Sequence, residues 1–194
     1  MMSNGEPGSV LLGTEDRASA LAAVKAMLRI SSSDDDALIA ALAETALGLA
    51  EQFLGRVLIA RTVQSMLPAL PGWQRLPASP VRAITLVEAV TQDGPGAVLP
   101  VSVLPVSSYA IDIDPRGDGW VRIIDAGGAA QVRVTSTAGQ ADGWAGIPSP
   151  LRQGAVLLAA YLFSERDTSR PPPAAITALW RPFRGLALAA AVHA

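Results

Sequence analysis

The sequence predicts an α+β protein, in which a helical body is built from both ends of the chain and a small antiparallel β-sheet is inserted between them. Three features predict this class. Residues 14–54 carry alanine and leucine at helical spacings, residues 58–138 are rich in β-branched residues, proline and glycine, and helical spacing returns at residue 150. We expect two N-terminal helices, a long C-terminal helix and a short terminal helix.

The first helix is expected over residues 14–30. Thr14 or Asp16 is predicted as its N-cap, because a short oxygen-bearing side chain can accept a hydrogen bond from an unpaired backbone N–H group. Its apolar positions recur at spacings of three and four residues, at Leu21, Val24 and Leu28. The helix is therefore amphipathic and should pack by one stripe.

The second helix is expected from Ser33 to Leu54, with Ser33 as its N-cap and Gly55 as its left-handed stop. Its apolar face is predicted to hold Leu38, Leu42, Leu49 and Phe53, with Ile39, Ala46 and Ala50 beside them. The run Asp34-Asp35-Asp36 is either a metal-binding cluster or the first turn of this helix. The helix start is preferred, because carboxylates there meet the positive end of the helix dipole.

The β-rich section is expected to form one small antiparallel sheet. Its strands are predicted at Arg61–Leu67, Val81–Val90, Trp120–Ile124 and Gln131–Thr137. The turns between strands are marked by Asp93-Gly94, Gly117-Asp118-Gly119 and Gly127-Gly128. Prolines at the ends of these runs keep the strands short.

Helical character returns at Ser149-Pro150, a serine N-cap followed by proline, and the helix should run to about residue 166. Its centre, residues 155–163, is apolar all round, so more than one face must be buried and a subunit contact is expected to cover the second. Residues 170–173 form a stiff proline spacer, residues 174–180 a short helix, and residues 181–184 a break before an alanine-rich tail.

These elements predict a single domain over residues 14–170, with the β-rich insertion at about 58–138. A flexible N-terminal arm, residues 1–13, precedes the domain. A C-terminal arm and tail, residues 171–194, follow it.

The composition argues against several classes of function. The formal charge is -2, from 15 basic and 17 acidic residues, so the chain lacks the basic stripe that binding to a DNA backbone requires. There is no cysteine, which excludes disulfides and thiolate metal sites. Residues 1–12 lack a signal-peptide pattern, and the longest apolar run, residues 155–163, is shorter than the roughly 20 residues of a membrane-spanning helix. No membrane partner is expected.

We identify no catalytic, cofactor-binding or metal-binding residues. The single histidine, His193, is the penultimate residue of a tail, which leaves no base for a Ser-His-Asp arrangement. Four carboxylates could meet in space as in a glycosidase, but nothing singles out Glu44, Glu51, Glu88 or Asp125. Residues 112–119 are rich in oxygen ligands like a calcium loop, but the twelfth position, Ile123, is not acidic, so a hairpin connection is preferred.

The four tryptophans are Trp73, Trp120, Trp144 and Trp180. They could stack on sugars or bases, or they could anchor a core or an interface. The structural use is preferred, because basic residues do not accompany them. Trp144 lies in a glycine-rich loop and Trp180 on the terminal helix, so these two are predicted to contact a partner.

Two groups of motifs form a recognisable pattern. The first consists of Val24-Lys-Ala-Met-Leu-Arg-Ile30, Asp34-Asp-Asp-Ala-Leu-Ile39 and Ala50-Glu-Gln-Phe-Leu-Gly-Arg-Val-Leu-Ile59. The second consists of Thr137-Ala-Gly139, Ile147-Pro-Ser-Pro-Leu-Arg-Gln153 and an apolar helix ending in Ser164-Glu-Arg166. Together they resemble the phage head-tail connector family, also called adaptor or head-completion proteins, which includes adaptors of gene transfer agents. The resemblance covers about residues 20–62 and 132–167, and the tail beyond Arg184 has no counterpart.

The resemblance implies a structural subunit without catalytic activity. It implies a ring of about twelve copies beneath the portal protein, a channel through which DNA passes without specific binding, and a lower surface for a tail-side stopper or tail-completion protein. The chain would be cytoplasmic during assembly and then part of the neck of a phage or a gene transfer agent particle. No cofactor is implied.

The contact with the portal is expected in the segment Ala174–Arg184. Its aromatic and basic residues have the composition of an interface anchor, and they are Trp180, Arg181, Phe183 and Arg184. Deletion of residues 171–194 is then expected to leave a folded protein that no longer joins capsids.

Two other functions stay open at this point. The chain could be a different particle component, such as a tail-completion or capsid accessory protein. It could also be a small hydrolase or sugar-binding module that uses the carboxylates and tryptophans of the β-rich section.

Overall fold

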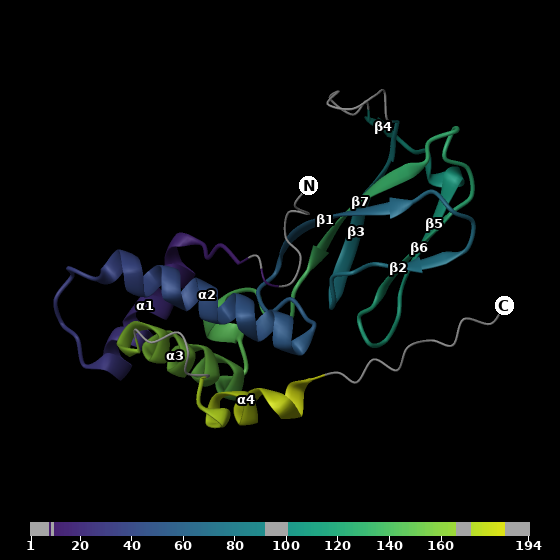
Figure 1. Cartoon of the computed structure of the whole chain (residues 1–194). Coiled ribbons are helices and arrows are strands. Elements are labelled where there is room, and N and C mark those ends of the chain that lie inside the picture. The colour runs from purple at the N-terminus through teal and green to yellow at the C-terminus, as the bar shows by residue number, and fades with distance from the viewer. Residues whose placement is uncertain (1–7, 9, 92–100, 166–171, 185–194) are drawn as a thin grey trace. The chain divides into compact units, whose positions relative to one another are not determined.

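The structure, a computed structural model, describes residues 8, 10–91, 101–165 and 172–184. The chain divides into two compact units. A β unit comprises residues 1–11 and 56–147, and a helical unit comprises residues 12–55 and 148–194 (Figure 1). The predicted α+β class is confirmed. The single domain over residues 14–170, with its flanking arms, stays a prediction.

The helical unit contains four helices in the described residues. They are α1 (Thr14–Leu28), α2 (Asp36–Leu54), α3 (Ser149–Ser164) and α4 (Ala174–Trp180), and a 3-10 turn η3 (Arg181–Phe183) follows. Helices α1, α2 and α3 pack against one another, and α4 packs on α3 and α2. Segments from both ends of the chain thus form one body, as predicted.

The starts of the helices differ from the sequence prediction. Gly13, and not Thr14 or Asp16, stands at the N-cap of α1 and makes no side-chain cap bond. Helix α2 begins at Asp36, three residues beyond the predicted cap Ser33, whose carbonyl accepts a hydrogen bond from the Asp36 N–H at 3.2 Å. Helix α3 begins at Ser149 with Pro148 before it, one residue earlier than predicted.

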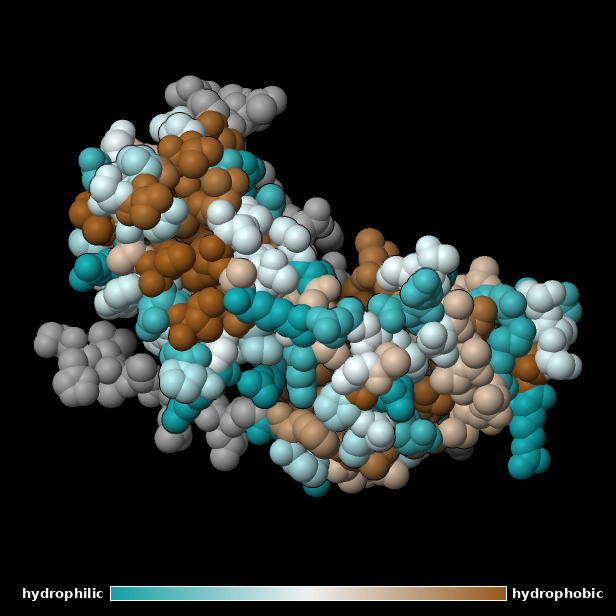
Figure 2. Space-filling view, turned by 180° about the vertical axis from the view of Figure 1, so that it is seen from behind, coloured by the Kyte–Doolittle hydropathy of each residue, from teal (hydrophilic) through white to brown (hydrophobic). Residues whose placement is uncertain are grey.

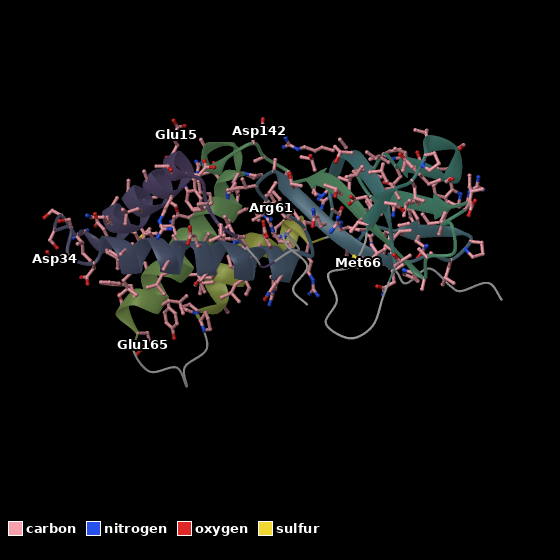
Figure 3. All side chains as sticks on the ribbon, turned by 90° about the horizontal axis from the view of Figure 1, so that it is seen from above. Glu15, Asp34, Arg61, Met66, Asp142 and Glu165 are labelled. Carbon is pink, nitrogen blue, oxygen red and sulfur yellow. The ribbon has the colours of Figure 1, made fainter. Side chains whose placement is uncertain are left out.

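The aspartate run lies mostly outside α2. Asp34 and Asp35 are exposed residues of the turn before the helix, and Asp34 stands at the tip of the helical unit (Figure 3). Asp36 forms an ion pair with Lys25 of α1. The ion pair, and not a carboxylate cap, ties the start of α2 to the end of α1. The predicted stop is confirmed, because Gly55 ends α2 with φ at 65°.

The predicted buried face of α2 was wrong in part, because Ile39, Ala46 and Ala50 are buried but two of the expected leucines are not. Leu38 and Leu49 are 52% and 41% exposed. The buried apolar face consists mainly of small residues, with three large side chains among them, and its members are Ile39, Ala40, Ala43, Ala46, Leu47, Gly48, Ala50 and Leu54. Because α2 packs against both α1 and α3, and small side chains let helix axes approach closely, the small-residue face lies inside. Helix α2 is long and apolar enough to cross a membrane, but half of its apolar window is buried in the protein, as in the core helix of a globular fold.

The described residues of the β unit form seven strands, which make up two antiparallel sheets. In chain order they are β1 (Arg61–Pro68), β2 (Trp73–Arg75), β3 (Val81–Val90), β4 (Val101–Val103), β5 (Tyr109–Ile113), β6 (Gly119–Ile123) and β7 (Gln131–Ala138). The first sheet has the order β1-β7-β3-β4 and the second has the order β2-β6-β5. Strands β1, β3, β6 and β7 were predicted. The sequence prediction missed β2, β4, β5 and therefore the second sheet.

One hydrophobic cluster joins the two sheets. It draws Val87, Val132 and Val134 from the first sheet and Val121 and Ile123 from the second. The turn at Gly127-Gly128, between β6 and β7, is confirmed by positive φ angles of 60° and 86°. The predicted turn at Asp93-Gly94 lies outside the described residues.

Candidate partner interface

Trp180, a predicted partner contact, lies inside the helical unit. Its side chain is 3% exposed, and its indole Nε1 donates a hydrogen bond to the Leu151 carbonyl at 3.2 Å. It lies directly over Gly154 of α3, where a Cβ atom would fall 2.2 Å from Nε1. Its ring also contacts Phe53, with 5.8 Å between centroids. Trp180 therefore fastens α4 to α2 and α3 within the same chain.

The other residues of this segment lie closer to the surface. Arg181 and Arg184 are exposed and Phe183 is half-buried. The Arg184 guanidinium carbon lies 5.3 Å from the centroid of the Phe53 ring, a cation–π distance. The structure thus gathers Trp180 and Arg184 around Phe53, and it leaves Arg181, Phe183 and Arg184 as the part of the segment that another protein can reach.

Trp144, the other predicted partner tryptophan, belongs to the β unit. It begins the 3-10 turn η2 (Trp144–Gly146) and is 4% exposed. The structure does not bring it together with Trp180 in one unit. Its side chain is therefore buried within the β unit, and its role in partner binding stays a prediction.

The outer face of the second sheet holds the exposed tryptophan. This face is opposite the one that carries the buried residues Val121 and Ile123. Trp73 of β2 pairs with Arg122 of β6 on the outer face, and the Arg122 guanidinium carbon lies 5.3 Å from the Trp73 ring centroid. Trp73 is 47% exposed. Exposed tryptophan and arginine are the residues most enriched in interface hot spots.

A second row on the same face contains Arg75, Trp120 and Asp112, side by side on β2, β6 and β5. Arg75 forms an ion pair with Asp118 at 2.7 Å. The indole Nε1 of Trp120 donates a hydrogen bond to Asp114 at 3.4 Å. Sequence inspection missed this face, because its residues come from three strands, two of which were not predicted.

The segment from Asp112 to Gly119 is the hairpin between β5 and β6, as preferred from the sequence. The Asp114 carboxylate accepts hydrogen bonds from the backbone N–H groups of Arg116 at 2.8 Å and Asp118 at 3.0 Å. The bond from Asp118, with smaller contributions from Arg116 and Trp120, holds the pKa of Asp114 below its usual value of 3.8. This carboxylate thus stabilises the turn in its ionised form.

The four carboxylates considered for catalysis are divided between the two units. Glu44 and Glu51 lie in the helical unit, whereas Glu88 and Asp125 lie in the β unit. Glu44 accepts hydrogen bonds from the Leu12 N–H and from Arg17, and Glu88 pairs with Arg133 at 2.8 Å. In the part of the chain that the structure describes, no three acidic, histidine or cysteine residues are grouped so as to hold a metal ion.

An apolar surface extends along the β unit. Large exposed hydrophobic side chains come from β4, from the 3-10 turn η1 (Val106–Ser108), from β5 and from the residue after β6. They are Val101, Val103, Val106, Ile111, Ile113 and Ile124. Figure 2 shows hydrophobic side chains gathered on the face of the β unit that this view presents. Exposed apolar side chains gathered on one face mark a surface that contacts other proteins.

Helices from both chain ends and a two-sheet insertion define an α+β fold whose exposed groups suit protein contacts. Solved structures with this fold come from gene transfer agent (GTA) particles. A chain in the neck of an empty GTA particle, with C6 symmetry, has a TM-score of 0.70 and 22% identity, and 97% of each chain is covered. A chain in the neck of a native particle, with C12 symmetry, has a TM-score of 0.67 at 22% identity and the same coverage.

A chain from the virion of a native GTA particle has a TM-score of 0.65 and 19% identity, again with 97% of each chain covered. No known protein family and no curated protein matches this sequence. At these identities the likeness establishes the fold. It extends over both units, including the β-rich section, for which the sequence resemblance offered only strand order.

Proposed function

We propose that this chain is a head-tail connector, or adaptor, subunit that forms a ring between the portal and the tail of a phage-like or gene transfer agent particle. The observation that carries the proposal is the full-length likeness to a chain in the neck of a GTA particle, which covers 97% of both chains. The motifs at residues 20–62 and 132–167 point independently to the same family. In this role the chain is a structural protein and not an enzyme.

The symmetry of the similar structures supports a ring of about twelve copies. The necks that contain this fold have C12 and C6 symmetry, so their chains repeat around an axis. Closed rings need two different surfaces on each subunit, one for each neighbour. The exposed apolar side chains of the β unit supply surface of the kind that such contacts bury. DNA would pass through the channel without specific binding, in keeping with the net charge of -2.

The C-terminal segment is proposed to dock onto the portal through three of the four residues that the sequence indicated. Trp180 holds the segment to its own helical unit, and Arg181, Phe183 and Arg184 are the residues that reach the portal. The opposite side of the ring would receive a tail-side stopper or tail-completion protein. The chain would be cytoplasmic during assembly and part of the particle neck afterwards.

Particles assembled without this protein test the proposal. A connector joins two finished substructures, so its loss is expected to leave DNA-filled heads and separate tails. Cryo-electron microscopy of the particle fraction, with the wild-type gene restored as the control, gives the result. Tailed particles in normal numbers would contradict the proposal, and empty or misshapen heads would favour a capsid accessory protein instead.

The docking proposal has its own test. The combined variant Arg181→Ser, Phe183→Ser and Arg184→Ser should stay folded, because these side chains are exposed or half-buried, yet it should restore few tailed particles to a strain that lacks the protein. The matched control is Arg29→Ser with Leu38→Ser, two exposed residues of the same helical unit. This pair should restore tails fully. Equal numbers of tailed particles from both variants would refute the docking proposal.

The deletion of residues 171–194 is a poorer test than the sequence suggested. It removes Ile176 and Trp180, both 3% exposed, and so strips a packed helix from the helical unit. A truncated chain could fail to join capsids simply because it unfolds.

A further inference from the structure

The sheet β2-β6-β5 has two open edges. Strand β2 forms one edge and β5 the other, and neither pairs with a further described strand. Both are antiparallel to the central strand β6, so they run parallel to each other. All of these strands belong to the β unit, so the placement of the two edges does not depend on the helical unit.

The β2 edge is aromatic and basic. Trp73 is exposed there, with the Arg122 guanidinium stacked over its ring. Arg75 lies two residues further along the same strand on the same face. Leu70, in the segment just before β2, is 57% exposed. The guanidinium of Arg122 forms no ion pair within the described residues, so it can meet a carboxylate from another molecule.

The β5 edge is apolar and acidic. Ile111 and Ile113 are 46% and 39% exposed, although their side chains lie on the side of the sheet that carries the core. Asp112, between them, is exposed on the outer face. Its carboxylate forms no hydrogen bond or ion pair with any residue that the structure describes. The charge of this edge is opposite to that of the β2 edge.

We infer that the β5 edge of one copy packs against the β2 edge of the next copy in the ring, with Asp112 facing Arg75 and Arg122 on the outer face and the two isoleucines on the opposite face of the joined sheets. This inference rests on the proposed function. Strands that lie along the ring axis keep their direction when the subunit is rotated about that axis, so two edge strands that run parallel within one subunit then meet as a parallel pair across each contact. The two edges differ, which is the requirement for a closed ring of identical subunits.

The exposed apolar area supports an interface at the β5 edge. The elements that precede β5 in the chain, β4 and η1, also carry exposed apolar side chains, among them Val103 at 65% and Val106 at 80%. The largest apolar patch on a typical monomer is about 300–600 Å². A stable contact needs roughly 800 Å² from each partner, which is more than a typical apolar patch supplies, so the contact has to include polar residues around it. The edges therefore account for the centre of the contact, and Asp112, Arg75 and Arg122 form its charged border.

The natural absence of cysteine allows a direct cross-linking test. Arg75 and Asp112 lie two strands apart within one chain, close enough for a short bismaleimide to join them there, so the two cysteines are placed in different chains. Particles assembled from an equal mixture of Arg75→Cys chains and Asp112→Cys chains are expected to give covalent dimers on a denaturing gel after a short bismaleimide is added. Particles that contain either variant alone should give no dimers, because like positions do not meet in a head-to-tail ring.

The outcomes separate this inference from the proposed function. Tailed particles from the mixture whose chains stay monomeric on the gel would overturn the edge contact and leave the connector proposal standing. Wild-type chains that form no ring in the particle would overturn the connector proposal, and this inference with it.

Exchange of the charges gives a second measurement, which also decides the matter if the cysteine variants do not assemble. Asp112→Arg alone and Arg122→Asp alone should each lower the yield of tailed particles by about tenfold or more, because like charges then meet at every contact in the ring. Both changes in one chain should recover most of the yield. Asp34→Arg, at an exposed aspartate of the helical unit, is the control and should change nothing. No loss in either single variant, or no recovery in the pair, would overturn the inference.

Discussion

Replacement of Trp180 by alanine is expected to lower the free energy of unfolding of the helical unit by about 3–5 kcal/mol, the usual cost of removing a buried aromatic side chain. Trp180 is 3% exposed, covers Gly154 and contacts Phe53. Its loss leaves a cavity that α3 cannot fill, because Gly154 has no side chain. Chemical denaturation followed by circular dichroism measures the change.

Trp73→Ala is the matched control for this prediction. It removes the same side chain from an exposed site in the β unit, where the cost should be within about 1 kcal/mol. If Trp180→Ala were no more destabilising than Trp73→Ala, α4 would not be an integral part of the helical unit. The refined docking proposal, in which Trp180 serves as an internal anchor, would then be wrong.

Gly139→Ala is expected to have a comparable effect on the β unit. A Cβ atom at this position would lie 2.3 Å from the Ala60 Cα and 2.4 Å from the Ala60 nitrogen, both backbone atoms that cannot move aside as a side chain can. The φ angle of 147° is one that residues with a side chain rarely adopt. The loss in the free energy of unfolding should exceed the roughly 1–3 kcal/mol that an unfavourable backbone conformation costs by itself.

Gly72→Ala separates the two contributions. Gly72 also has a positive φ, 116°, but a Cβ atom there would meet nothing within 4 Å. Its substitution should cost only the conformational part, and the difference between the two variants measures the close approach to Ala60. Equal losses in parallel denaturation experiments would show that Gly139 does not pack closely against the backbone of residues 59–60. Such a result would contradict the backbone hydrogen bonds from Ala60 to Ala141 at 2.8 Å and from Gly139 to Pro80 at 2.8 Å.

The same glycine explains part of the sequence resemblance in physical terms. The motif Thr137-Ala-Gly139 ends strand β7 at the point where the chain pairs in parallel with Ile59 through Ala141. Ile59 closes the other motif group, which begins at Val24. The two distant signatures therefore meet at one backbone contact, which only glycine permits.

Helices and long strands were predictable because local periodicity determines them. Their ends were less so, since α1 and α2 begin without the side-chain caps that the sequence offers. Part of the buried face of α2 was predicted wrongly because large apolar side chains were expected to be the buried ones. Close packing between three helices instead favours alanine inside and leaves Leu38 and Leu49 outside.

The candidate interface could be predicted only in part. Strands β2 and β4 have three residues each, too short for an alternating pattern, and β5 was obscured by the aspartates around it. Without those strands, nothing in the sequence indicates that Trp73 and Arg122 stack or that Asp112 lies in a row with Arg75. Trp180 was identified as a key residue, but the sequence does not show whether a tryptophan is buried within its own chain or exposed to a partner.

A cryo-electron microscopy reconstruction of the neck of the particle that contains this protein tests the central claim most directly. The account predicts about twelve copies of this α+β fold in a single ring between the portal and the first tail protein. Neck density that holds no such ring, or the same fold found only in the capsid shell or the tail, would contradict it.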